Sequence, residues 1–296
     1  MASRMPRYWW HASGSSPLIH YLGQSVLIML AIGGVVFAIF GLRLFFLQSR
    51  LVFRPSRELL GTPRDWGCSF DDVVLQIHGG VTVRGWWIPG SGRSKVILYF
   101  PGSVGNISCE LSTLRWLANT GAQVVTIDYP GFGQSDGRPS ESGCYQAAEA
   151  VWHYAVAQRA IAPADIVVFG RSLGVAIAAR VAARNLCGGL ILHSGIASVP
   201  AVAARRYLGF PVYLFCYIRF NTLKYVARCH CPTLVMHSKT DRVIPISHGE
   251  RIWHAASPPK RFLPIPGDHY TNAWHAAPNL ADEIASMLGL EAEAPQ

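Results

Sequence analysis

The pattern of hydrophobic and polar positions divides the chain into one long apolar run and a series of shorter elements. Residues 18–42 contain no Asp, Glu, Lys or Arg, and about 20 such residues allow a helix to cross the hydrocarbon core of a bilayer. A signal peptide has a shorter apolar region, of roughly 7–15 residues, and ends in a small-residue cleavage site that is not seen here. The pattern therefore predicts an N-terminal flank over 1–17 and a single-pass transmembrane anchor over 18–47, in preference to a signal peptide or a buried helix.

The segment after the anchor changes to a basic composition that proline and glycine interrupt. The stretch "RLVFRPSRELLGTPRDWG" has the composition of a linker, which we place at 48–69, and the folded domain then extends over 70–296. The first part of that domain, "DDVVLQIHGGVTVRGWWIP", alternates between apolar and polar residues. This alternation predicts a β-hairpin with its turn at residues 78–80.

Short β-branched runs alternate with amphipathic or alanine-rich stretches through the rest of the domain. Strands are expected at 95–100, 123–129, 166–169, 189–193, 232–237 and 261–265, and helices at 106–120, 142–159, 173–185, 247–256 and 278–288. Continuous apolar strands separated by helices are typical of a mostly parallel sheet covered on both faces, so we predict an α/β fold. Residues 198–228 interrupt the alternation with an aromatic and basic insertion, either a lid over the carboxyl ends of the strands or a plain pair of connecting helices.

Charge and composition favour a membrane surface as a partner. The chain has 296 residues, half of them hydrophobic and 15% charged, with a formal net charge of +9. Several arginines flank the anchor, where they would meet anionic headgroups. The others form no basic stripe with interleaved aromatics, so no nucleic acid is expected as a partner. Arg4 and Arg7 precede the uncharged run 18–42, and four arginines follow it closely, at positions 43, 50, 54 and 57. This bias favours a cytoplasmic domain.

The cysteines indicate neither a disulfide framework nor a metal site. Their number, seven, is odd and their spacings are irregular, which favours reduced thiols. The motif "RCHC", with Cys229 and Cys231, lacks a second Cys/His pair at ligand spacing and runs directly into an apolar strand. We therefore expect no bound metal.

One motif of the domain indicates a catalytic site. The stretch "VVFGRSLGVA" joins an expected strand to an expected helix through the pattern G-x-S-x-G, which is typical of a nucleophile elbow. Gly170 and Gly174 flank Ser172, where any larger side chain would collide with the neighbouring strand or helix. The turn exposes the hydroxyl at the start of a helix, where the helix dipole favours negative charge. Ser172 is thus the candidate nucleophile.

A serine nucleophile needs a histidine base, and the histidine needs an acid that fixes its tautomer. After an elbow of this kind the chain order is Ser, then Asp or Glu, then His. Asp241 in "LVMHSKTDRVIP" and His269 in "FLPIPGDHYTNAW" each follow an expected strand, so both belong at the same carboxyl edge as the serine. Asp268 is the weaker candidate acid, because a residue adjacent to the histidine along the chain is badly placed to reach its ring.

Acyl transfer also needs hydrogen-bond donors for the oxyanion. One donor is the backbone N–H of the residue after the nucleophile, here Leu173, and the other comes from the loop after the 95–100 strand. That loop reads "FPGSVGN", in which the glycines permit close approach of the backbone. The N–H of Ser103 is its natural donor.

These motifs together resemble the α/β-hydrolase superfamily. The segments "YFPGSVGNIS", "IDYPGFGQSDG", "GRSLG", "PTLVMHSKTDRVIP" and "GDHY" occur in its order and spacing. The chain looks most similar to membrane-anchored α/β-hydrolase-domain-containing serine hydrolases, a group with protein depalmitoylases and serine aminopeptidase-like members. The resemblance covers about residues 50–290. It implies Ser172, Asp241 and His269 as the triad and Ser103 and Leu173 as the oxyanion hole.

Three positions depart from the family pattern without removing a reacting group. Pro101 stands where the oxyanion loop usually has histidine, and Pro130 stands where arginine is usual. Ser238 replaces the glycine that is common before the acid loop.

The leading hypothesis is a membrane-tethered serine hydrolase that cleaves an acyl ester or thioester through an acyl-enzyme, with no cofactor. Its substrate would be an acyl-bearing molecule such as a lipid or an acylated protein. Two alternatives stay open: a serine peptidase or amidase with the same triad, and a catalytically silent hydrolase fold that recruits partners at the membrane. The intact set of reacting residues argues against the silent fold, since a scaffold needs none of them.

Overall fold

The structure, a computed structural model, describes residues 17–91 and 95–270 together with residues 280 and 284. The chain divides into two units, Met1–Phe46 and Leu47–Gln296. The second unit contains all the strands of the described chain and all the candidate site residues named above.

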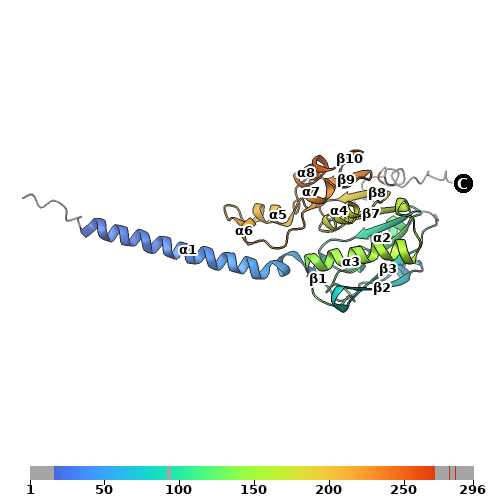
Figure 1. Cartoon of the computed structure of the whole chain (residues 1–296), viewed down its shortest axis with the longest axis horizontal. Coiled ribbons are helices and arrows are strands. Elements are labelled where there is room, and N and C mark those ends of the chain that lie inside the picture. The colour runs from blue at the N-terminus through green and yellow to red at the C-terminus, as the bar shows by residue number, and fades with distance from the viewer. Residues whose placement is uncertain (1–16, 92–94, 271–279, 281–283, 285–296) are drawn as a thin grey trace, which may run out of the picture. The chain divides into compact units, whose positions relative to one another are not determined.

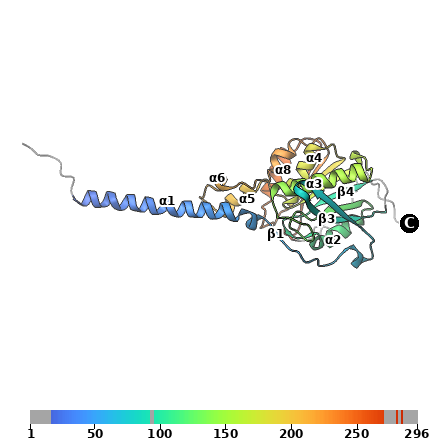
Figure 2. The same cartoon turned by 60° about the horizontal axis from the view of Figure 1, so that its bottom comes forward.

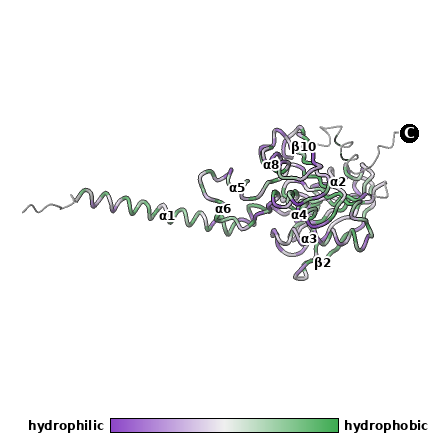
Figure 3. Tube along the Cα trace, turned by 45° about the horizontal axis from the view of Figure 1, so that its top comes forward, coloured by the Kyte–Doolittle hydropathy of each residue, from purple (hydrophilic) through white to green (hydrophobic). Residues whose placement is uncertain are grey.

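Helix α1 (Pro17–Val52) begins in the first unit and ends in the second. Figure 3 shows hydrophobic residues along much of its length. Within His20–Val52 its most apolar window has a mean hydropathy of 2.6, and 6% of that window is buried. This length and composition fit a membrane span and also a signal sequence, so the anchor stays a prediction.

An eight-stranded sheet forms the centre of the second unit and runs from β10 at the top of Figure 1 to β2 at the bottom. The strand order is β10-β9-β8-β7-β4-β6-β3-β2. The strands are β2 (Asp71–Ile77), β3 (Val81–Ile88), β4 (Val96–Phe100), β6 (Gln123–Ile127), β7 (Ile166–Arg171), β8 (Gly189–His193), β9 (Thr233–Ser238) and β10 (Lys260–Ile265). β3 is antiparallel to both β2 and β6, and the other neighbours are parallel. The predicted α/β fold, with its hairpin at one edge, is confirmed.

Helices cover both faces of this sheet, as its apolar strands require. Val96 and Leu98 of β4 belong to one hydrophobic cluster, whereas Ile97 and Tyr99 belong to another. The first cluster includes residues of α3, α4, α7 and α8, and the second includes residues of α2; Figure 2 shows α4 and α8 on the opposite side of the sheet from α2. The helices are α2 (Leu111–Ala118), α3 (Glu141–His153), continued by a π-helical turn (Tyr154–Gln158), α4 (Gly174–Arg184), α5 (Val199–Arg206), α6 (Val212–Phe215), α7 (Thr222–Val226) and α8 (Ser247–Ala255), with 3-10 turns at Pro63–Trp66, His78–Gly80, Ile107–Glu110 and Pro163–Asp165.

The predicted parallel strands all occur, and their bounds agree with the structure to within two residues. The helix expected at 106–120 is divided into a 3-10 turn and α2. The helix expected at 278–288 lies outside the described residues, apart from Leu280 and Ile284, which are buried in the second cluster.

The segment expected to be a linker, 48–69, is instead packed into the second unit. Phe53 is 3% exposed, and its ring centre lies 6.3 Å from that of Phe132. Strand β1 (Arg54–Pro55) pairs in parallel with β5 (Val104–Gly105). Basic and proline-rich composition is typical of exposed chain, but one buried ring and backbone pairing are enough to order this segment. The folded unit therefore begins near residue 47 and not at residue 70.

The insertion at 198–228 combines a packed helix with an outlying segment. Its last part, α7, packs against α4, where Arg180 donates a hydrogen bond to the Tyr225 hydroxyl at 3.0 Å. The base of the insertion is closed by Thr222, whose hydroxyl donates to the carbonyl oxygen of Ile196 at 2.6 Å. Most residues of α5 and α6 are exposed or half-buried. The insertion is therefore more than a plain pair of connecting helices.

Candidate active site

Ser172 lies at a sharp turn between β7 and α4, as the motif predicts. Its backbone φ is +54°, in the left-handed region that residues other than glycine rarely adopt, and its N–H donates to the carbonyl oxygen of His193 at 2.9 Å. A Cβ on Gly170 would overlap the backbone of Gly174, and a Cβ on Gly174 would overlap the carbonyl oxygen of Phe100. The two glycines thus let the strand and helix meet closely enough to hold the strained serine.

The Gly174→Ala substitution is expected to destabilise the folded domain. The added methyl group would overlap the carbonyl oxygen of Phe100, which belongs to the sheet backbone, and overpacking of this kind costs about 1–3 kcal/mol or more. Gly102→Ala is the matched control, because a Cβ there would meet Ser172 Cβ at an ordinary 3.4 Å. Thermal unfolding followed by circular dichroism should show a lowered Tm for Gly174→Ala only. Equal Tm values for both variants and the parent would contradict this packing.

The structure brings the three predicted residues into one hydrogen-bonded chain. Ser172 Oγ lies 3.1 Å from His269 Nε2, and His269 Nδ1 lies 2.7 Å from Asp241 Oδ2. Asp241 and His269 are each 7% exposed, whereas Ser172 is half-buried. The three residues follow β7, β9 and β10, so three loops at the carboxyl edge of the sheet supply them. A hydroxyl, an imidazole and a carboxylate in this order suit the activation of a serine for attack on a carbonyl carbon.

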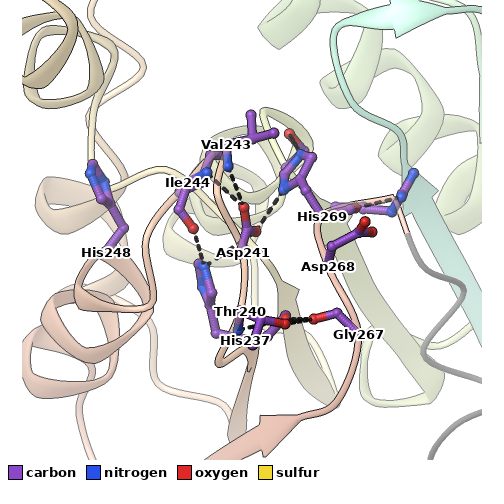
Figure 4. Close-up of polar contacts among 12 residues, drawn as sticks. His237, Thr240, Asp241, Val243, Ile244, His248, Gly267, Asp268 and His269 are labelled. Atoms are coloured by element: carbon purple, nitrogen blue, oxygen red, sulfur yellow. Dashed lines mark hydrogen bonds and ion pairs between the residues drawn. The ribbon is translucent and has the colours of Figure 1, made fainter.

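The Asp241 carboxylate is oriented by the backbone of its own loop, as Figure 4 shows. Its Oδ1 accepts the N–H groups of Val243 at 2.9 Å and Ile244 at 2.7 Å, which leaves Oδ2 directed at His269. The weaker candidate acid, Asp268, points away from the His269 ring in Figure 4. Of the two candidate acids, Asp241 is therefore the one that contacts the histidine.

A second histidine, His237, lies 3.6 Å from the same carboxylate. Its Nε2 donates to the carbonyl oxygen of Ile244 at 2.8 Å, and burial lowers its pKa below the ordinary histidine value. A neutral His237 brings no competing positive charge to Asp241, so the carboxylate acts on His269. Sequence reasoning placed His237 only among the other histidines of the chain, and its place at the end of an expected strand was the one signal for this contact.

The loop after β4 lies beside the candidate nucleophile, Ser172. A Cβ on Gly102 would lie 3.4 Å from Ser172 Cβ and 3.7 Å from its Oγ, so the loop backbone approaches the serine directly. Within the part of the chain that the structure describes, no acceptor takes the backbone N–H of Ser103 or of Leu173. One of these donors belongs to the elbow and the other follows Gly102. Both are thus available to an oxyanion, which requires such donors.

Comparisons with known proteins show the family to which the chain belongs. The family model described as "alpha/beta hydrolase fold" matches residues 95–215. The uncharacterized protein Rv2307c of Mycobacterium tuberculosis is 30% identical over 237 residues, which cover 79% of this chain and 83% of that protein. The chain belongs to the α/β-hydrolase family.

Other members of the α/β-hydrolase family are similar over smaller parts or at lower identity. A Xenopus tropicalis protein, alpha/beta hydrolase domain-containing protein 17C, is 33% identical over 129 residues, which are 43% of this chain and 39% of that protein. Among solved structures, the Pyrococcus furiosus esterase Pf2001 matches with a TM-score of 0.65 and 19% identity, covering 80% of this chain and 98% of that chain. An identity this low shows a shared fold. It is the family match that makes the protein a hydrolase of the α/β-hydrolase fold.

This hydrolase lacks the histidine that usually supports the oxyanion loop, and a tyrosine contacts the loop instead. The carbonyl oxygen of Pro101 accepts a hydrogen bond from the Tyr129 hydroxyl at 2.9 Å, and Tyr129 is fully buried. The second departure, Pro130, packs at the start of α3, where a Cβ on Gly143 would lie 3.1 Å from its Cγ. The loop is thus supported by a residue that the family pattern did not indicate.

The third departure, Ser238, ties together the two loops that carry the candidate acid, Asp241, and the candidate base, His269. The Ser238 hydroxyl donates to the carbonyl oxygen of Gly267, and so does the Thr240 hydroxyl (Figure 4). Gly267 lies two residues before His269, so these bonds hold the histidine loop against the acid loop. A glycine at position 238 would lack the first of them.

The segment that sequence composition indicated as a linker supports the oxyanion loop of the hydrolase. The backbone N–H of Arg54 donates to the carbonyl oxygen of Ser103 at 2.8 Å. Asn106 Nδ2 donates to the carbonyl oxygens of Ser56 at 3.2 Å and Glu58 at 2.6 Å. These bonds use backbone groups of the segment, which every sequence offers, so no residue pattern indicated them.

A buried carboxyl group also holds this loop. Asp128 Oδ1 accepts the Ile107 N–H at 2.8 Å. Burial raises the pKa of Asp128 from 3.8 to about 7, although the bond from Ile107 and the charge of Arg57 both act to lower it. The folded hydrolase therefore binds a proton here over a pH range in which the unfolded chain has lost it.

Stability is expected to fall between about pH 4 and pH 7 through Asp128. The stabilisation by the bound proton is complete below the unfolded pKa and is lost as the pH rises through the folded pKa. Asp128→Asn keeps a carbonyl acceptor but does not ionise, so its Tm should fall less than that of the parent from pH 5 to pH 8. Asp136→Asn, an exposed position in the same loop, should keep the parental slope. Identical pH slopes for the parent and Asp128→Asn would contradict this assignment.

Arg171 links the elbow of the hydrolase to the histidine loop. Its guanidinium lies 2.8 Å from Glu110 Oε1 and donates to the carbonyl oxygen of His269 at 3.1 Å. Glu110 Oε2 in turn accepts the Tyr99 hydroxyl at 2.9 Å. The arginine and glutamate side chains are 15% and 10% exposed, so each largely buried charge is paired with a charge of opposite sign. Sequence reasoning treated Arg171 as the variable position of the motif and missed this contact.

A cavity of about 660 Å³ lies apart from the catalytic candidates, between β2, α3 and α4. The residues of α4 that line it, Arg180 and Arg184, lie toward the opposite end of that helix from Ser172. Arg184 also forms an ion pair with Glu149 at 2.8 Å. We assign this cavity no part in the chemistry of Ser172.

Proposed function

We propose that this hydrolase is a membrane-anchored serine hydrolase that cleaves an acyl ester or thioester. The observation that carries the proposal is the hydrogen-bonded chain from Ser172 through His269 to Asp241, with distances of 3.1 and 2.7 Å. A catalytically silent fold would have no need of this chain. Helix α1 supports the anchor by its length and composition, and the arginines that follow it favour a cytoplasmic domain.

The geometry supports a two-step reaction. Ser172 Oγ attacks the acyl carbonyl carbon while His269 Nε2 takes the hydroxyl proton, and the N–H groups of Leu173 and Ser103 receive the negative charge on the carbonyl oxygen. His269 then gives the proton to the leaving alcohol or thiol, and the acyl group stays on Ser172. A water molecule gives a proton to His269, attacks the acyl-enzyme and releases the acid, and His269 returns the proton to Ser172. Asp241 accepts the Nδ1–H throughout and stabilises the imidazolium.

The substrate class follows from location and from chemistry. A domain held at a bilayer meets acyl chains on lipids and on acylated proteins. An alcohol or thiol is also an easier leaving group than an amine, so the same triad acts on esters with less demand on the active site. The Pyrococcus furiosus protein of the same fold is named an esterase, which supports an ester in preference to an amide.

A fluorophosphonate probe tests the proposed nucleophile. Full-length protein in detergent is expected to form a covalent adduct, and peptide mass mapping should place the adduct on Ser172. The protein should then hydrolyse a p-nitrophenyl ester and an acyl thioester faster than the matching p-nitroanilide. A folded protein that stays unlabelled would overturn the proposal, and a faster anilide reaction would make the protein an amidase or peptidase.

Membrane anchoring is tested separately. Full-length protein expressed in cells should stay in the membrane fraction after alkaline carbonate extraction and should retain its N-terminus, as shown by intact mass. Release into the supernatant, or loss of residues 1–46, would contradict the anchor.

A further inference from the structure

Exposed apolar side chains gather in the outlying part of the insertion. Leu208 is 86% exposed and Leu214 is 77% exposed, and Tyr213 and Tyr217 are 52% and 50% exposed. All four lie within residues 208–217, around helix α6. Exposed apolar side chains of this size gain free energy when they leave water, by about 25 cal/mol per Å², and a contiguous group of them marks an interaction surface.

The end of this segment is held by hydrogen bonds from a buried glutamine side chain. Gln48 Nε2 donates to the carbonyl oxygen of Phe215 at 2.7 Å, and Gln48 Oε1 accepts the N–H groups of Tyr217 at 2.9 Å and Ile218 at 3.2 Å. Gln48 is 5% exposed. One glutamine side chain therefore satisfies three backbone groups at the end of this segment.

A second clamp acts just beyond the first. Glu141, the first residue of α3, accepts the N–H of Arg219 at 2.6 Å and the N–H of Phe220 at 2.8 Å. Phe220 is held at a backbone φ of +40°, which a residue adopts only where its surroundings enforce it. These bonds fix the backbone at 215–220, so the exposure of Tyr217 on that stretch is a feature of the fold.

The order of the chain relates this segment to the predicted anchor. Gln48 follows the uncharged run 18–42 by six residues, which span at most about 20 Å even when fully extended. Since Gln48 is bonded to the backbone at 215–218, the apolar segment must lie close to the point where the chain would leave the bilayer. This step rests on the proposed function, because it requires α1 to be a membrane anchor.

The positive charge of the insertion indicates which kind of partner its apolar segment contacts. Residues 199–228 contain no Asp or Glu, and their five basic residues are Arg205, Arg206, Arg219, Lys224 and Arg228. Lysine and arginine near an anionic membrane surface contribute about 1 kcal/mol each. A second copy of the chain would instead set the same positive charges against one another across a two-fold axis. Apolar tips with a cationic border are typical of segments that lie in the membrane interface.

We propose that residues 207–217 form a membrane-contacting surface, with Leu208, Tyr213, Leu214 and Tyr217 at the headgroup boundary of the anionic bilayer that holds α1. The insertion follows β8, and the last residue of β8, His193, accepts the N–H of the nucleophile Ser172 at 2.9 Å. This contact therefore sets the carboxyl edge of the sheet, with the candidate triad, close to the lipid surface. The acyl substrate would reach Ser172 from the bilayer, which narrows the substrate class to membrane-borne acyl esters and thioesters.

Photochemical crosslinking of full-length protein tests this surface. A benzophenone amino acid replaces Leu214 in one variant and Leu186 in another, and each is reconstituted in vesicles of phosphatidylcholine and phosphatidylglycerol. Leu186 is the matched control, because it is 79% exposed but lies before the amino end of β8, at the opposite edge of the sheet. Irradiation should give at least about tenfold more lipid adduct at position 214 than at 186. Equal yields at the two positions, or no adduct at 214, would overturn the proposal.

Two further results distinguish contact with lipid from contact of this surface with another partner. Crosslinks from position 214 to a second copy of the chain, or to an acidic protein, would also overturn it. The Arg205→Glu/Arg206→Glu variant should lower the lipid adduct at position 214 several-fold in the anionic vesicles. An unchanged yield would contradict the part that charge plays in the contact.

Fluorophosphonate labelling in the same vesicles keeps the two proposals distinct. Labelling of Ser172 without a lipid adduct at position 214 would leave the serine hydrolase standing and remove this surface. A lipid adduct at position 214 without labelling of Ser172 would remove the serine hydrolase and leave this surface standing. Labelling also shows that each photoreactive variant has folded around its active site.

Discussion

The Ser172→Ala variant is expected to lose esterase activity by a factor on the order of 10⁶ in kcat. In the proposed reaction the serine oxygen is the atom that bonds to the acyl carbon, so without it His269 and Asp241 have no nucleophile to activate. The residue is half-buried at the turn, and alanine removes only the hydroxyl, so the Tm should stay close to that of the parent. Hydrolysis of p-nitrophenyl acetate by full-length protein in detergent, together with circular dichroism, measures both quantities.

A neighbouring serine provides the matched control for this prediction. Ser194 follows β8, has a backbone φ of +46° and is 1% exposed, and its buried hydroxyl has no hydrogen-bond partner among the described residues. Ser194→Ala breaks no such bond, so kcat should stay within about threefold of the parent. Parental activity in Ser172→Ala would show that the nucleophile is a different group. A comparable loss in Ser194→Ala would show that the loss at Ser172 is not specific to a nucleophile.

The Asp241→Asn variant is expected to lower kcat by about 10⁴-fold. The carboxylate accepts the His269 Nδ1–H at 2.7 Å and so leaves Nε2 free to take the serine proton. An asparagine NH₂ group at the same position would favour the opposite tautomer, in which Nε2 carries the proton and is no longer a base. Because the side chain keeps its size and its carbonyl can still accept from Val243 and Ile244, the fold should persist. Steady-state kinetics should show the loss in kcat and little change in KM.

Asp268→Asn distinguishes the two candidate acids. Its carboxylate accepts the N–H of Tyr270 at 2.9 Å and points away from the His269 ring in Figure 4. An asparagine there keeps an acceptor for that bond, so kcat should change by less than about threefold. A loss in Asp268→Asn as large as that in Asp241→Asn would refute the assignment of the acid.

Local sequence determined much of the fold of this protein. The strands of the parallel sheet are continuous apolar runs because both faces of the sheet are buried, as the two clusters on either side of β4 show. The hairpin turns at residues 78–80, where the sequence offers two adjacent glycines. The elbow is also a local device, since a strand, two glycines and a helix within ten residues leave Ser172 little choice of conformation.

The order of strands and loops along the chain also predicted part of the candidate site. Asp241 and His269 each follow a strand of a parallel sheet, and the carboxyl ends of parallel strands meet at one edge. That rule placed the two residues near Ser172 but did not orient them. The orientation comes from backbone N–H groups around Asp241 and from the hydroxyls of Ser238 and Thr240 on Gly267.

The remaining features were decided by tertiary structure alone. The supposed linker pairs with the oxyanion loop through its backbone, Tyr129 supports the loop that lacks histidine, and Gln48 holds the insertion. Each contact joins residues far apart in the chain and uses a carbonyl or N–H group that every residue possesses. Composition and periodicity report which side chains avoid water, so they determined the strands, the apolar helix and the elbow. They do not predict which distant backbone groups form hydrogen bonds with one another, because those pairs depend on how the whole chain packs.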